Sequence, residues 1–164
     1  MVSEYNQGWL RKWFTGEPHL TLYQEGQEYL KRWYVIPRNK HFNIYLHQFL
    51  KSDEDEALHD HPWYWCSIIL KGRYIEFKQD CDPVIRHAGS VAFRSPETAH
   101  RVSLFGIWDW KTLSASSPLP VWTLFITGKK RREWGFHCPK GWIPWTKFTT
   151  GPKGSIRVGC GEYA

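Results

Sequence analysis

Short apolar segments separated by turn signals constrain the fold of this chain of 164 residues more than any other feature. After residue 30, glycine, proline and Asp82-Pro83 punctuate segments that recur at a spacing of about 8–12 residues. Such a pattern is typical of an antiparallel sandwich or barrel. The expected strands lie at residues 29–37, 42–50, 63–70, 73–78, 90–94, 100–105, 120–128 and 133–137, the last two forming a hairpin around residues 129–132.

The two ends of the chain predict other structures. Residues 3–20 suit a short helix with Ser3 as N-cap, with Trp9, Leu10 and Trp13 on one face, and with Gly16 as its end. Residues 139–164 are rich in glycine and proline and predict an irregular tail wrapped on the domain. We therefore expect one domain over residues 1–164 with its core at about residues 30–138.

The overall composition excludes several classes of protein. Hydrophobic residues make up 41% of the chain and charged residues 23%, which is ordinary for a globular protein. No apolar run is long enough to cross a bilayer, and no signal peptide follows the start, so we expect a cytoplasmic protein without membrane contact. The four cysteines form no CxxC pair and are expected to be reduced, namely Cys66, Cys81, Cys138 and Cys160.

Net charge and aromatic content leave a binding function open. The formal charge of +6 permits an anionic partner, and aromatic residues make up 17% of the chain. The basic run at residues 129–132 is expected in a solvated turn, and nucleic acid is the less favoured partner for it. Tryptophan side chains could also rim a barrel mouth that captures a nucleotide, a sugar or a nucleic acid strand, the candidates being Trp63, Trp65, Trp108 and Trp110.

Three histidines indicate a metal site. Residues i and i+2 of a strand point to the same side, so His59 and His61 can share one ion, whereas Asp60 between them is expected to cap the turn. His100 begins a later strand and is the expected third ligand. Three histidine ligands leave open positions for a substrate.

The segments around these histidines resemble a known family. "HDH" followed by Gly72, and "GSVAFRSPETAH" ending at His100, resemble the two motifs of the cupins over about residues 43–127. The resemblance implies an all-β double-stranded β-helix, or jelly-roll barrel, with a metal at its mouth. The whole chain also looks like uncharacterised cupin-like proteins of bacteriophages and bacteria.

The motifs depart from the cupin pattern at two places. The usual glutamate of the first motif is replaced by Trp65 or Cys66, and Thr98 stands where the second motif has glycine. The resemblance therefore implies three histidines without a carboxylate, as in the thiol dioxygenases such as cysteine dioxygenase. Cys66 matches the position of that enzyme's crosslinking cysteine, and a plain buried thiol is the alternative.

Together these features predict a metal-dependent cupin enzyme, foremost a mononuclear iron dioxygenase or other oxidoreductase acting on a small anionic molecule. Zinc, nickel or manganese would also suit the three imidazoles, and a non-redox lyase, isomerase or hydrolase remains an alternative, as does a binding module without catalysis. A homodimer is left open. The candidate catalytic residues are Cys66 and Glu76, and the candidate substrate residues are His47, Trp65, Arg94 and Arg131.

Overall fold

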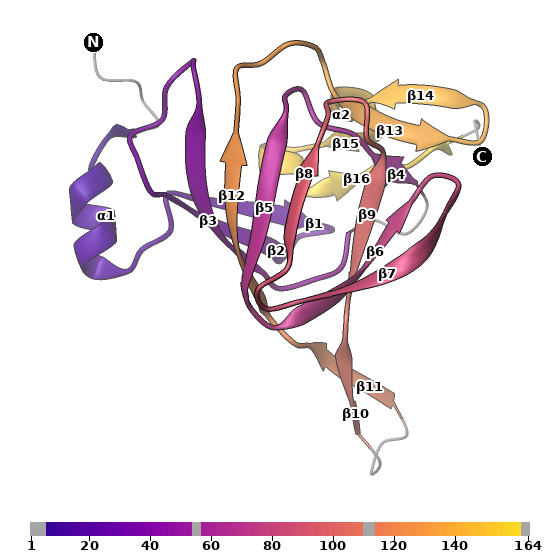
Figure 1. The fold of residues 1–164 in the computed structure, drawn as a ribbon, viewed down its shortest axis with the longest axis horizontal. Helices are drawn as coiled ribbons and strands as arrows, with labels where there is room; N and C mark the ends of the chain where they lie inside the picture. The colour runs from indigo at the N-terminus through magenta and orange to yellow at the C-terminus, as the bar shows by residue number, and fades with distance from the viewer. Residues whose placement is uncertain (1–5, 54–56, 110–113, 162–164) are drawn as a thin grey trace.

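The computed structural model describes residues 6–53, 57–109 and 114–161, and its centre is a pair of six-stranded antiparallel sheets (Figure 1). The first sheet has the order β1 (Leu20–Gln24), β2 (Gln27–Tyr34), β3 (Asn43–Phe49), β12 (Val121–Thr127), β5 (Trp65–Lys71) and β8 (Val91–Arg94). The second has the order β14 (Gly141–Pro144), β13 (Gly135–Cys138), β4 (Leu58–His59), β9 (His100–Leu104), β6 (Arg73–Lys78) and β7 (Cys81–His87).

The strand order is that of a jelly roll. The strands β3, β12, β5 and β8 of the first sheet lie opposite β4, β9, β6 and β7 of the second. Along the chain, β3, β4, β5 and β6 cross from sheet to sheet in turn, which is the connectivity of paired Greek keys. The predicted all-β jelly-roll barrel with a short N-terminal helix is therefore confirmed.

The core lies between the sheets because inward and outward residues alternate along each strand. On β12, residues Val121, Thr123, Phe125 and Thr127 are buried and the residues between them are half-buried. Side chains from both sheets then meet in one cluster, made of Ile69, Tyr74, Val102, Leu104 and Val121.

The expected hairpin between residues 120–128 and 133–137 is wrong. The strand β12 pairs with β3 and β5 in the first sheet, so both of its edges are used. The strand β13 pairs with β4 and β14 in the second sheet. Both segments were recognised as strands, but local pattern does not reveal which neighbour a central strand will take.

Several further elements differ from those expected. The tail after residue 138 is not irregular throughout, since it contains β14, α2 (Trp145–Phe148), β15 (Thr149–Thr150), η2 (Pro152–Gly154) and β16 (Ile156–Arg157). The strands β1 and β7 and the hairpin of β10 (Gly106–Asp109) and β11 (Ser114–Pro118) were not predicted. None of the helices in the described ranges is long and apolar enough to span a membrane.

The N-terminal helix α1 (Trp9–Thr15) follows Gly8, whose positive φ of 66° suits a glycine N-cap. The predicted cap Ser3 lies outside the described residues. Trp9 and Trp13 each donate an indole hydrogen bond to the carbonyl of Tyr34, at 2.6 and 2.8 Å. Leu10 is instead 60% exposed, so its predicted place on the packing face is wrong.

A disulfide between Cys138 and Cys160 corrects the expectation of four reduced cysteines. It ties the end of β13 to the segment after β16, and Cys160 is fully buried beside Phe148. No spacing signal marks this pair in the sequence, because the two cysteines are brought together only by the path of the tail.

We expect this disulfide to stabilise the fold by about 3 kcal/mol, the value for a closed loop of this size. Urea unfolding with and without a reductant measures the effect, and the Cys138→Ala/Cys160→Ala variant should be insensitive to reductant. In the denatured, unreduced protein only Cys66 and Cys81 should react with a thiol reagent. Four reactive thiols per chain would contradict the pairing.

Candidate metal centre

The structure brings His59, His61 and His100 together at one end of the barrel. Their candidate ligand atoms all lie within 4.8 Å of one another. His59 on β4 pairs directly with His100 on β9, and the Nε2 atoms of His61 and His100 are 3.0 Å apart. The three nitrogens thus converge on a common point, as ligands of one ion do.

Carboxylates lie behind two of these imidazoles. Asp53 Oδ2 is 3.9 Å from His59 Nδ1, and Glu76 Oε1 is 3.4 Å from His100 Nδ1. Asp53 also accepts hydrogen bonds from the Val102 amide, at 2.6 Å, and from the Tyr29 hydroxyl. Carboxylates on the far side of metal-binding histidines orient the rings and increase their basicity.

Glu76 was a candidate catalytic residue, and the structure gives it a supporting place instead. Its side chain is 1% exposed, and its Oε2 accepts hydrogen bonds from Arg86 Nε and Arg94 Nη2, each at 3.0 Å. Burial alone would raise the pKa of Glu76, but His100, Arg94 and Arg86 together lower it to about 2. Glu76 is therefore a carboxylate at neutral pH, facing the back of His100.

Two of the three histidines, His59 and His61, have lowered pKa values and are neutral at physiological pH. Burial lowers the pKa of His59 to about 4, although Asp53 acts in the opposite direction. Burial also lowers the pKa of His61 well below its usual range, and the neighbouring His59 and His100 act in the same direction. Metal binding requires deprotonated imidazole, so this donor set fits a divalent ion without losing protons.

Aromatic rings enclose the cluster. The Trp65 ring lies 5.0 Å from that of His61 and 4.9 Å from that of His100, measured between centroids. Phe136 and Trp134 lie beside His59, at 5.9 and 6.2 Å. Trp65 thus stands beside the centre where the cupin pattern has a carboxylate, and the metal-type cluster in the described part of the chain consists of histidines alone.

Cys66 lies on the other face of β5. Trp65, Ser67 and Ile69 are buried toward the barrel, and Cys66 alternates with them as a half-buried free thiol. The Cys66 side chain is thus one residue out of phase with the residues of β5 that face the site, and its catalytic role stays a prediction. A resemblance read from the spacing of letters does not reveal that phase.

The cations predicted for substrate lie elsewhere than expected. Arg94 is held by Glu76, and Arg131 is exposed, with its guanidinium over the Tyr64 ring at 5.3 Å from the centroid. Arg94 is thus paired with the carboxylate that lies beside His100, whereas Arg131 is on the surface. The strand β10, which carries Trp108, lies beyond the end of β9 opposite His100 (Figure 1), and Trp110 lies outside the described residues.

Sequence reasoning missed Arg32, which lies inside the barrel. Arg32 on β2 pairs with His47 on β3 and donates from Nε to His47 Nε2 at 2.8 Å. Its guanidinium lies over the Tyr45 ring, 4.8 Å from the centroid, and burial lowers its pKa. His47 is 3% exposed and stacks on Phe125, so it faces the barrel interior. The sequence feature that could have identified Arg32 is its position on the strand: it alternates with Leu30 and Tyr34, which face inward.

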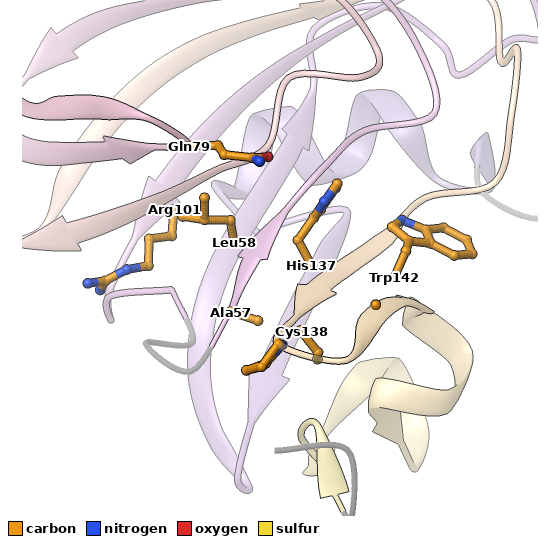
Figure 2. A pocket seen from close by; sticks show the side chains of 9 residues that line it. Ala57, Leu58, Gln79, Arg101, His137, Cys138 and Trp142 are labelled. Carbon is orange, nitrogen blue, oxygen red and sulfur yellow. The ribbon is translucent and has the colours of Figure 1, made fainter.

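Two surface cavities lie outside the histidine cluster. One, of about 460 Å³, lies on the second sheet and is lined by residues that include Leu58, Arg101, His137 and Trp142 (Figure 2). The other, of about 450 Å³, contains Lys51, Asp53 and Arg101. We place the candidate centre at the histidines because convergent ligand chemistry, rather than hollow volume, defines a metal site.

Comparison with known proteins gives no reaction for this jelly roll and its three-histidine cluster. No family model and no curated protein matches the chain. Among solved structures it is similar to a cupin-like protein of Thermotoga maritima, at 13% identity over 61% of this chain and 68% of that one, with a TM-score of 0.45.

Two other similar structures have described chemistries of their own. One is a putative mannose-6-phosphate isomerase of Ralstonia eutropha, at 13% identity over 61% of this chain and 84% of that one, with a TM-score of 0.48. The other is Fe(II)-HppE with an alternative substrate, at 11% identity over 66% of this chain and 54% of that one, with a TM-score of 0.48. These chemistries belong to those proteins.

We predict that His59→Ala or His100→Ala abolishes metal binding while the barrel stays folded, because each ring lies at the barrel end and outside the cluster of Ile69 and Val121. Elemental analysis of untagged protein measures the metal, and circular dichroism measures the fold. The variant His87→Ala is the control, since His87 is exposed on β7. Unfolding of both ligand variants would show that the histidines are structural.

Proposed function

We propose that this protein is a metal-dependent cupin enzyme that oxidises a small anionic substrate with dioxygen, using a divalent metal, foremost iron. His59, His61 and His100 would hold the ion. The observation that carries the proposal is the convergence of three imidazoles, with ligand atoms within 4.8 Å of one another, backed by the carboxylates of Asp53 and Glu76. When bound, iron would supply a redox-active Lewis acid with open coordination positions.

The charge of the donor set favours an anionic substrate. Three neutral ligands leave the charge of a dication uncompensated in the first coordination sphere. The nearest carboxylates contact the Nδ1 side of the rings, and Glu76 is itself paired with Arg86 and Arg94. A carboxylate or thiolate of the substrate would balance the remaining charge.

Arg32 and His47 supply groups that could bind the anionic end of such a substrate. Among the ion pairs of the described residues, none involves Arg32. Because His47 Nε2 accepts from Arg32, the neutral ring carries its proton on Nδ1, and that buried atom has no hydrogen-bond partner among the described residues. The hydroxyl of Thr123, paired in register with His47, is likewise buried without one.

These groups lie on the same interior side as the metal ligands. Phe125 stacks on His47 at 5.2 Å and also contacts the His61 ring at 5.6 Å, so one ring separates the two positions. The positive charge of Arg32 is close enough to contribute to the lowered pKa of His61. We infer a substrate short enough to span this single aromatic layer, with its anionic group at Arg32 and its reacting group at the histidines.

The aromatic wall would exclude water from the reacting group. Trp65 is 2% exposed and packs against Phe125 at 5.2 Å, and both contact His61. A drier site strengthens every electrostatic interaction inside it.

The experiment for the reaction class begins with the metal. Elemental analysis of protein purified without a histidine tag, followed by oxygen-electrode measurements with small thiols, hydroxy acids and amino acids, should give iron and substrate-dependent oxygen uptake. Zinc or nickel without oxygen uptake would favour a non-redox lyase, isomerase or hydrolase at the same site. Protein that binds no metal and ignores chelators would favour a binding module.

We predict that Arg32→Gln weakens the binding of small carboxylates to cobalt-loaded protein by about 10–100-fold, the range for losing a hydrogen bond to a charged group. The change in the visible cobalt spectrum during titration with acetate, lactate and cysteine measures the affinity. The control Arg131→Gln removes the same charge at an exposed position and should change nothing. Equal weakening by both variants would show that only net charge matters.

A further inference from the structure

We infer that Asp60 is a positioning residue: its carboxylate locks the β13–β14 hairpin onto the back of the ligand strand and thereby fixes the directions of His59 and His61. This inference rests on the proposed metal site. Asp60 lies between the two ligands in the chain and is fully buried, so it points to the opposite side of β4 from them.

The carboxylate of Asp60 is saturated by donors from the C-terminal segment. Its Oδ1 accepts from the Gly135 amide at 2.9 Å. Its Oδ2 accepts from Trp142 Nε1 at 3.0 Å and lies 3.1 Å from His137 Nε2 and from Arg132 Nη1. The expectation that Asp60 caps a local turn is therefore wrong, because every one of these partners is more than 70 residues away in sequence.

The backbone repeats the same attachment. The amide of Asp60 donates to the Gly135 carbonyl at 3.0 Å, so the backbone of residue 60 is tied to β13 through both its amide and its side chain. The strand β4 is only two residues long and pairs with β13 through His59 and Leu58. A pairing of two residues is too short to fix by itself the backbone that carries His59 and His61. The buried carboxylate of Asp60 supplies the additional constraint.

The two strands of the hairpin pack tightly against each other, which makes the hairpin a rigid support. A Cβ on Gly135 would lie 2.1 Å from the Ile143 carbonyl oxygen and 2.8 Å from Trp142 Cε2, so only glycine fits there. From the same strand, Phe136 pairs in register with His59 and contacts its ring. One hairpin therefore holds His59 from its ring side through Phe136 and from its backbone through Asp60.

The outer end of this network is accessible. His137 and Trp142 line the 460 Å³ cavity on the second sheet, as Leu58 does (Figure 2). Trp142 is 40% exposed, so its indole can be changed without opening the core. A substitution at Trp142 therefore tests the role of the network in placing the ligands separately from its contribution to folding.

The test is Asp60→Asn in the full chain, loaded with cobalt. An amide keeps the shape but presents an N–H group to donors, so we expect metal affinity to fall about 10–100-fold, the usual effect of altering groups behind metal ligands. The visible cobalt spectrum should shift as well, which loss of stability alone would not cause. Asp82→Asn, at an exposed position on β7, is the matched control.

The outcomes separate this inference from the proposed function. If the wild-type protein binds no cobalt, the proposed metal site fails, and the inference fails with it. If the wild type binds and Asp60→Asn binds equally tightly with the same spectrum, the inference alone is overturned. Should Asp60→Asn not fold, Trp142→Phe removes one donor at the accessible end, and an unchanged affinity and spectrum in that variant would overturn the inference.

Discussion

The burial of three imidazoles between two sheets is the constraint on which the rest of this end of the barrel depends. Buried polar groups cost free energy unless they are paired, so each ring needs partners on the side away from the common point. Asp53 lies 3.9 Å from His59 Nδ1 and Glu76 lies 3.4 Å from His100 Nδ1, so each carboxylate interacts with its ring electrostatically. The carboxylates in turn need donors, which come from the Val102 amide and from Arg86 and Arg94. Breaking any of these links would leave an unpaired buried charge, which is more costly than losing the pair as a whole.

The jelly roll makes this arrangement out of segments that lie far apart in the chain. Its connectivity sets β4 beside β9, so His59 and His100 become direct neighbours, and it sets β6 beside β9, so Glu76 comes behind His100. On the other side of β4, the C-terminal hairpin replaces the solvent that would otherwise contact Asp60. The tail is therefore part of the site's support, and the disulfide at Cys138 anchors the end of the strand that carries it.

The sequence allowed prediction of the fold and of the three histidines because both depend on short-range periods. Alternation by two residues identified the main strands and put His59 and His61 on one side. The same rule could not locate Arg32 or Asp60, whose roles depend on which strand lies across from them. The match in spacing at Cys66 is one residue out of phase with the inward face of β5. The predicted hairpin of β12 and β13 was wrong for a related reason: recognising a strand in the sequence does not show which strand it pairs with.

The arginines of the barrel differ in which groups compensate their positive charge. This difference matters more for the chemistry of the site than the number of arginines does. Arg86 and Arg94 share the buried carboxylate of Glu76, so their charge is largely compensated within the protein. Arg32 faces a neutral histidine and an aromatic ring, and burial disfavours its charge, while no ion pair among the described residues supplies it with a carboxylate. A dication held by neutral ligands would add uncompensated positive charge to the same interior. With such a metal bound, as we propose, the interior would favour an anion by electrostatics alone, and this preference would hold for a redox and for a non-redox metal alike.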